Sequence, residues 1–198
     1  MWALVEDNTI TKLINNPKAM VIGGTQYSRN IFSFRWSNAE REAIGIYEVV
    51  FNNAKKKDEE YYTNTNQTFT YDADAGTVTA TYGDATAKAH ADANATDDDG
   101  NDLDPVVVIE GLKTKKIRNV KIQAASILTQ TDWYIVRKTD AGTSVPSAIT
   151  NHRAAVRTKC AAMETAITNA SNTPAIETLY TRNADGVRPL GDLPTLEV

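Results

Sequence analysis

Short stretches of alternating hydrophobic and polar residues, separated by turn signals, run through the first fifty residues. Trp2–Glu6 and Thr9–Ile14 are two such stretches, and the Asp7-Asn8 pair between them favours a two-residue hairpin turn. Gly23-Gly24 marks a second hairpin turn further along the chain. The pattern predicts a compact unit of antiparallel strands over residues 1–52.

Two further signals complete this N-terminal unit. The run Ser37-Asn38-Ala39-Glu40 matches a capping box, in which the Ser and Glu side chains bond backbone N–H groups, so it predicts a short helix that Gly45 ends. Ile46–Phe51 is β-branched and alternating, which predicts a strand that returns to the sheet. The aromatic residues expected to supply most of the core are Trp2, Phe32, Phe34, Trp36, Tyr47 and Phe51.

Residues 53–105 form a Thr- and Ala-rich middle segment. Gln67–Asp72 and Gly76–Tyr82 alternate Thr with larger residues on either side of a turn, which predicts a β-hairpin insertion. Its Thr-rich faces suggest that a neighbouring surface, such as another subunit, covers its other side. The rest of the segment has few large apolar residues and ends in the acidic run Asp97–Asp104.

From Pro105 onward, apolar residues recur at intervals of three and four, which is typical of helices. Leu112–Leu128 reads as an amphipathic helix, and Thr131-Asp132 is placed to cap a short helix after it. A longer helix is predicted to run through Ala170, with Arg153 interrupting its apolar stripe. The heptad-like seam on that helix consists of Ile149, Val156, Cys160, Met163, Ile167 and Ala170.

This seam has two interpretations. The favoured one is a helix that packs on its own domain, and the other is an intermolecular coiled coil. Residues 106–182 are then a helical domain in the form of a bundle or hairpin, and residues 183–198 an extended tail that lies against another part of the structure. The predicted fold class is α+β, with an N-terminal antiparallel β-rich unit, a β-hairpin insertion and a C-terminal helical region.

Composition and charge exclude several classes of protein. The formal net charge is −4, which argues against a general nucleic-acid binder because that class presents a basic face. No apolar run approaches the roughly 20 residues that a membrane helix needs, and the N-terminus lacks the pattern of a secretory signal. We therefore expect neither a nucleic-acid nor a membrane partner.

The residues that could perform catalysis are few. The two histidines, His90 and His152, have no second ligand at metal-binding spacing, and His152 is expected to face solvent or a partner. Cys160 is the only cysteine, and we expect it to pack as a small hydrophobe on its helix. No nucleophile–base pair or cofactor motif is visible, so the prediction is a protein that is not an enzyme and has no cofactor.

The acidic run Asp97–Asp104 is the strongest candidate for a metal site. Calcium prefers six to eight oxygen ligands, which such a run can offer. When Gly100 is aligned with the glycine of an EF-hand loop, Ala95 and Val106 fall where the first and last carboxylates belong. The favoured interpretation is an acidic surface loop, and an adventitious divalent cation is the lesser one.

Three blocks in the C-terminal half resemble a known family. Thr131–Lys138, Gly142–Pro146 and His152–Arg157 resemble the helical C-terminal region of the tailed-phage tail protein family, described as phage tail assembly chaperone or tail-fibre-assembly-like. Segments similar to the start of small virion-associated proteins of marine phages are Met1–Val5, Asn30–Phe32 and Ile44–Tyr47. The resemblance covers about half of the chain, mainly its two ends, and implies no catalytic residues.

The resemblance and the patterns lead to one functional expectation and two alternatives. We expect a non-enzymatic structural component of a phage virion, in the tail or tail-fibre region, made in the host cytoplasm and contacting other phage structural proteins and copies of itself. The alternatives are a tail-fibre assembly chaperone that leaves the particle, and a receptor- or glycan-binding surface module that uses exposed aromatics such as Phe69, Tyr71 and Tyr82. The expected interaction residues are Trp133, Tyr134, Arg137, Val156, Cys160, Met163 and Ile167. Trp133 is expected to be an anchor, because it lies at a helix start where its large ring can reach a neighbouring helix.

Overall fold

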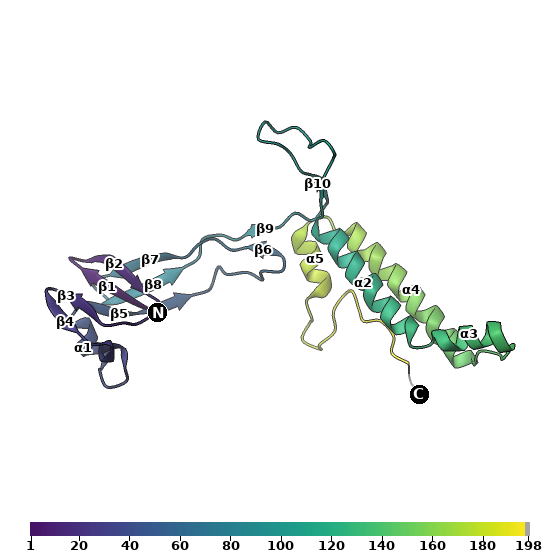
Figure 1. Cartoon of the computed structure of the whole chain (residues 1–198), viewed down its shortest axis with the longest axis horizontal. Coiled ribbons are helices and arrows are strands. Elements are labelled where there is room, and N and C mark those ends of the chain that lie inside the picture. The colour runs from purple at the N-terminus through teal and green to yellow at the C-terminus, as the bar shows by residue number, and fades with distance from the viewer. Residues whose placement is uncertain (197–198) are drawn as a thin grey trace. The chain divides into compact units, whose positions relative to one another are not determined.

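The computed structural model describes residues 1–196, so the last two residues of the predicted tail lie outside the described part. The chain divides into two compact units, Met1–Thr86 and Ala87–Val198. The first unit is built from strands and the second mainly from helices, as the labels in Figure 1 show. The fold is therefore α+β, as the sequence predicts.

The first unit is centred on a curled five-stranded sheet with the strand order β2-β1-β5-β8-β7. Its strands are β1 (Trp2–Glu6), β2 (Thr9–Ile14), β5 (Ile46–Asn52), β7 (Thr68–Asp72) and β8 (Thr77–Thr81). The β1–β2, β1–β5 and β7–β8 pairs are antiparallel.

The β5–β8 pair is parallel, with Val49 opposite Val78, so the sheet is mixed where the hairpin insertion joins it, whereas the strands within residues 1–52 pair antiparallel as predicted. Alternation of hydrophobic residues reports that a strand has one buried face, but it is the same for either strand direction. A long connection joins the end of β5 to β7, and a hairpin then joins β7 to β8. The direction of β8 follows from these two connections.

Apolar residues gather on both faces of this sheet. On one face lie Ala3, Val5, Val49, Val78 and Ala80, with Phe69, Tyr47 and Tyr71 packed against them. The hydroxyls of Tyr71 and Tyr47 share a hydrogen bond of 3.0 Å, and this bond, with burial, raises the pKa of Tyr47 to about 12. The Thr-rich hairpin therefore buries its larger side chains inside its own unit.

The other face is covered by small elements: β3 (Met20–Ile22), β4 (Thr25–Tyr27), the 3-10 helix η1 (Arg29–Phe32) and α1 (Asn38–Glu42). The residues buried beneath them are Leu4, Ile14, Ile22, Ile31 and Ile46. Trp2, Phe32 and Trp36 pack against this cluster as expected, but Phe34 is 94% exposed and Phe51 is also exposed. Both were predicted as core residues because an isolated aromatic gives no sign of the face on which it lies.

The predicted turns of the first unit are confirmed. Asp7 and Asn8 adopt φ values of 50° and 59°, as the two-residue turn between β1 and β2 requires. Ser37 accepts a hydrogen bond from the Glu40 N–H while the Glu40 side chain accepts one from the Ser37 N–H, which completes the capping box. Gly45, at φ 81°, ends the turn that leads into β5.

Several strands of two residues each follow. β6 (Tyr62–Thr63) pairs with β9 (Thr86–Ala87) where the first unit ends. β10 (Ala93–Asn94) pairs with β11 (Val108–Ile109), and the acidic run lies in the loop between them.

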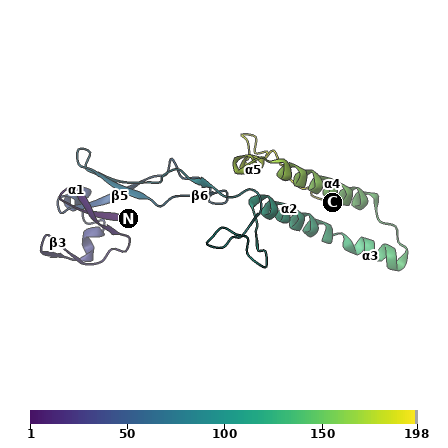
Figure 2. The same ribbon diagram turned by 90° about the horizontal axis from the view of Figure 1, so that it is seen from above.

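Four helices form the rest of the second unit: α2 (Leu112–Thr129), α3 (Asp132–Ala141), α4 (Ser147–Asn169) and α5 (Thr173–Tyr180). Figure 2 shows α2 leading into α3 and the chain returning along α4. The spacing of apolar residues predicted α2 and α4, and the Thr131-Asp132 cap predicted α3, with ends within a few residues of those observed. No helix in residues 1–196 is both long and apolar enough to cross a bilayer.

The core of the second unit lies between α2 and α4. Val120 and Ala124 of α2 pack with the seam of α4, and α5 adds Leu179 and Tyr180. Leu190 of the C-terminal tail is also buried in this core, and its N–H donates to the Leu179 carbonyl over 3.0 Å. The tail therefore lies on the helices, as predicted for its described part.

Candidate protein-interaction surface on helix α3

Helix α3 is the one helix of eight or more residues in the described chain that buries none of its side chains. Trp133 is 50% exposed, and Ile135 and Val136 are exposed as well. The rings of Trp133 and Tyr134 lie 3.8 Å apart between centroids, and the Arg137 guanidinium lies 5.6 Å from the Trp133 ring. These side chains make α3 an apolar surface with an aromatic pair and a cation, a composition enriched at the centres of protein interfaces.

The corner that leads into α3 is held by Arg153 of α4, a charged residue that is 8% exposed. Its Nη1 lies 2.7 Å from the Leu128 carbonyl oxygen, 2.7 Å from Thr131 Oγ1 and 2.8 Å from Asp132 Oδ1. One guanidinium thus binds the end of α2, the connecting residue and the first residue of α3. This arrangement fixes the direction in which α3 leaves the helical pair.

The connection differs in one respect from the sequence prediction. Thr131 occupies the N-cap position of α3, but its side chain makes no capping hydrogen bond. Its hydroxyl instead donates to the Leu128 carbonyl over 3.0 Å and accepts from Arg153, and the residue is buried. The pairing with Arg153 takes the hydroxyl away from the N–H groups of α3. At the other end, Gly142 adopts φ 66° and ends the helix.

The seven predicted interaction residues fall into two groups. Trp133, Tyr134 and Arg137 lie together on α3, where Trp133 is half exposed and no helix of the described chain covers it, so its role as an anchor stays a prediction about a contact with another surface. The remaining four, Val156, Cys160, Met163 and Ile167, are buried in the core of the second unit. The seam packs against α2 of the same chain, which is the favoured of its two interpretations.

Cys160 behaves as the small buried hydrophobe that the sequence predicts. Burial raises the pKa of its thiol, and a hydrogen bond to Glu164 over 3.4 Å raises it further. The neutral thiol is thus the favoured form, whereas a nucleophilic cysteine needs the opposite shift. His152 is also buried, so its expected exposure is wrong: it lies beside Arg153 on the covered side of α4. His90 is partly exposed before the start of α2.

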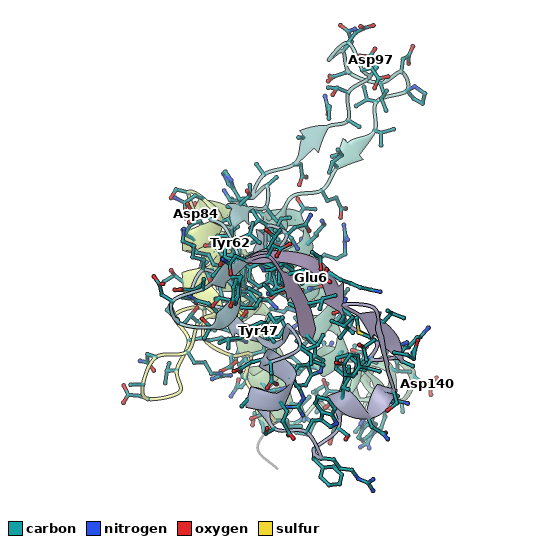
Figure 3. All side chains as sticks on the ribbon, turned by 90° about the vertical axis from the view of Figure 1, so that its left-hand side faces the viewer. Glu6, Tyr47, Tyr62, Asp84, Asp97 and Asp140 are labelled. Atoms are coloured by element: carbon teal, nitrogen blue, oxygen red, sulfur yellow. The ribbon has the colours of Figure 1, made fainter. Side chains whose placement is uncertain are left out.

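The acidic loop is organised around Asp97. Its Oδ1 accepts the N–H groups of Asn101 and Asp99 over 2.8 and 3.0 Å, and the bond from Asn101 does most to lower the pKa of Asp97. The carboxylate is thereby engaged in a turn at the end of the loop, where Figure 3 labels it. In residues 1–196, no group of three His, Cys, Asp or Glu side chains is arranged to hold a metal ion.

Sequence reasoning missed Arg153 as a positioning residue. The sequence analysis treats this arginine as an interruption of the apolar seam of α4, but an arginine at an apolar position indicates a structural role. A buried guanidinium needs several acceptors, and a nearby helix end supplies carbonyl groups.

Comparison of the chain with models of known protein families, with characterised proteins and with solved structures found no significant match.

Proposed function

We propose that this protein is a non-enzymatic structural component of a bacteriophage particle, in the tail or tail-fibre region, that acts through contacts between subunits. The observation that carries the proposal is α3, which exposes Trp133, Ile135 and Val136 on a helix held in place by Arg153. An exposed apolar helix that is held rigidly is suited to docking, because the helix loses little conformational entropy on binding. The resemblance of the Thr131–Lys138 block to phage tail proteins supplies the biological setting.

The chemistry of α3 indicates the kind of surface that it contacts. Trp133 and Tyr134 present an aromatic pair that fits an apolar pocket, and Arg137 beside them fits a carboxylate at the rim. The Trp133 ring is the expected centre of the contact, since Trp is the residue type that most often dominates interface energetics.

A tail-fibre assembly chaperone is the second candidate, and the same exposed helix favours it, because a chaperone also presents apolar surface to a client protein. A glycan- or receptor-binding module has less support. The aromatics that it would use include Phe69 and Tyr71, which pack against the core of the first unit and are not presented as an exposed stripe.

The experiment is complementation of phage that lack this gene with Trp133→Ala, Trp133→Phe and the control Val187→Ala. Because Trp133 is half exposed, its truncation is expected to change the free energy of unfolding by less than about 1 kcal/mol, compared with roughly 3–5 kcal/mol for a buried Trp. We expect Trp133→Ala chains to fold but to be lost from purified particles, and Trp133→Phe to be retained. Val187 is an exposed apolar residue outside α3, and its variant should be incorporated normally.

Normal incorporation and normal infectivity of the Trp133→Ala particles would exclude α3 as the docking surface. Absence of the wild-type chain from completed particles, together with a folded Trp133→Ala variant that leaves fibres unassembled, would favour the chaperone, because the helix would then be needed before completion of the particle.

A further inference from the structure

The hairpin formed by β10 and β11 exposes apolar residues that nothing else in residues 1–196 covers. It spans residues 93–109, and none of its side chains is buried. Its ladder continues beyond the two named strands, with the Ala95 N–H donating to the Val107 carbonyl over 2.7 Å. Four consecutive aliphatic residues, Val106 to Ile109, are each at least half exposed. A two-stranded ribbon of this kind is only marginally stable alone, which indicates that another surface covers it.

The same hairpin is strongly acidic. It contains five aspartates and no lysine or arginine, the aspartates being Asp97, Asp98, Asp99, Asp102 and Asp104. All five lie on the side of the turn, so the hairpin has an acidic end followed by an aliphatic stretch. Figure 3 shows Asp97 at the outer end of the ribbon.

The outward face of α2 has the complementary character. It holds a shallow, mainly apolar depression of about 500 Å³ lined by Thr114, Ile117, Arg118, Lys121, Ile122 and Ala125. Ile122 within it is 58% exposed. The helix contains no acidic residue and five basic ones, all within its first ten residues: Lys113, Lys115, Lys116, Arg118 and Lys121. Lys116 is buried, whereas Lys115, Arg118 and Lys121 are exposed, the last two in ion pairs with Glu110 and Glu164.

The two surfaces also agree in length and polarity. Val106 to Ile109 extend about 10 Å as a strand, and Ile117 to Ala125 rise about 12 Å along a helix. When the acidic end of the hairpin points toward the N-terminus of α2, its aspartates lie over the lysines. In that orientation, alternate side chains of its aliphatic stretch face Ile122 and Ala125.

A chain cannot bring its own two surfaces together. The base of the hairpin is pinned to the start of α2, where Asp92 accepts hydrogen bonds from the Gly111 N–H (2.7 Å) and the Thr114 hydroxyl (2.8 Å). A Cβ at Gly111 would lie 2.3 Å from the Ala91 carbonyl oxygen, so the two segments are in close contact there. From this base the hairpin extends away from the helices (Figure 1).

We propose that the β10–β11 hairpin of one copy docks on the outward face of α2 in a second copy. Each chain then donates one hairpin and accepts another, a head-to-tail contact that closes into a ring or continues as a fibre. The proposal deepens the proposed structural role by naming a self-contact, but it is tested on the purified chain and stands or falls separately from presence in a phage particle.

The experiment uses two charge-reversed forms of the full chain. The hairpin variant is Asp98→Lys with Asp99→Lys. The helix variant is Lys115→Glu with Asn119→Glu, which leaves the Arg118–Glu110 and Lys121–Glu164 ion pairs intact. A control with the same charge change as the hairpin variant is Asp74→Lys with Asp185→Lys, two exposed positions elsewhere. Far-UV circular dichroism establishes that each variant folds, and sedimentation velocity measures its size.

We expect wild type and control to sediment as assemblies at about 50 mM salt and to dissociate at about 500 mM, where charges are screened within a few ångströms. Each reversed variant alone should be monomeric. An equimolar mixture of the two should reassemble, because each hairpin then meets an α2 face of opposite charge. Wild type that is monomeric at low salt, a variant that assembles alone, or a mixture that stays monomeric would each overturn the proposal.

Discussion

The role of Arg153 in positioning α3 can be tested by removing its side chain. In Arg153→Ala, the Leu128 carbonyl and the Thr131 hydroxyl lose a charged donor at 2.7 Å, in a place where Thr131 and Arg153 are both buried. Hydrogen bonds to charged groups contribute about 1.5–3 kcal/mol each. Asp132 is half exposed, so its ion pair with Arg153 adds less than about 1 kcal/mol.

Water can reach part of the vacated corner, so we expect a loss of about 3 kcal/mol in the free energy of unfolding of the helical unit. The assay is urea denaturation followed by circular dichroism at 222 nm, which reports mainly on α2 to α5 because the first unit is built largely of strands. Arg157, one turn further along α4 and exposed, supplies the control: Arg157→Ala should change stability by less than about 0.5 kcal/mol.

Hydrogen exchange gives a second reading of the same variant. Amide groups of α3 should exchange faster in Arg153→Ala than in wild type, while those in the middle of α4 keep their relative protection. Equal stability of Arg153→Ala and Arg157→Ala, with unchanged exchange in α3, would refute the role given to Arg153.

Three further predictions concern other parts of the chain. Gly76→Ala should destabilise the first unit by about 1 kcal/mol, and Gly45→Ala by clearly more. Both glycines have positive φ, but of the two only Gly45 would place a Cβ against a backbone atom, the Val5 carbonyl oxygen at 2.5 Å. Equal urea midpoints of the two variants would contradict this. The raised pKa of Cys160 predicts that a thiol reagent labels the native chain at pH 8 more slowly than the urea-unfolded chain, and equal rates would show that the thiol is accessible. The pKa of Asp92 is lowered below its usual 3.8 mainly by the hydrogen bond from a backbone N–H, so its contribution to stability is present above that value and lost as the pH falls through the lower, folded value. Asp92→Asn, which keeps an acceptor, should therefore lose less stability than wild type between neutral and acid pH in thermal melts, and identical pH profiles would contradict the assignment.

The helices could be predicted from the sequence because a buried helical face repeats along the chain. Val156, Cys160, Met163 and Ile167 recur at intervals of three and four, and the structure buries all of them against α2. The hairpin turns were equally accessible, since Asp7-Asn8 can adopt positive φ at low cost. In these cases the residues that determine the structure are close together in the sequence.

The parts that could not be predicted depend on contacts between distant segments. The parallel β5–β8 pair requires knowing which strands meet, and the alternation of Val49 and Val78 with polar neighbours is the same for both directions. Exposure of Phe34 and Trp133 depends on what lies beyond the element that carries them, which their own neighbours in sequence do not encode. The sequence therefore predicts the candidate surface only in part. It indicates the three residues of α3, but it does not indicate that Arg153, which interrupts the apolar seam, positions that helix.

The measurement that tests the central claim most directly is the amount of this chain in purified phage particles, determined by denaturing electrophoresis and quantitative mass spectrometry. A structural subunit should be present in a fixed number of copies, a multiple of three or six if it follows the symmetry of a tail or tail fibre. Absence from the particle, together with abundance in the lysate of infected cells, would contradict the structural role and favour the assembly chaperone.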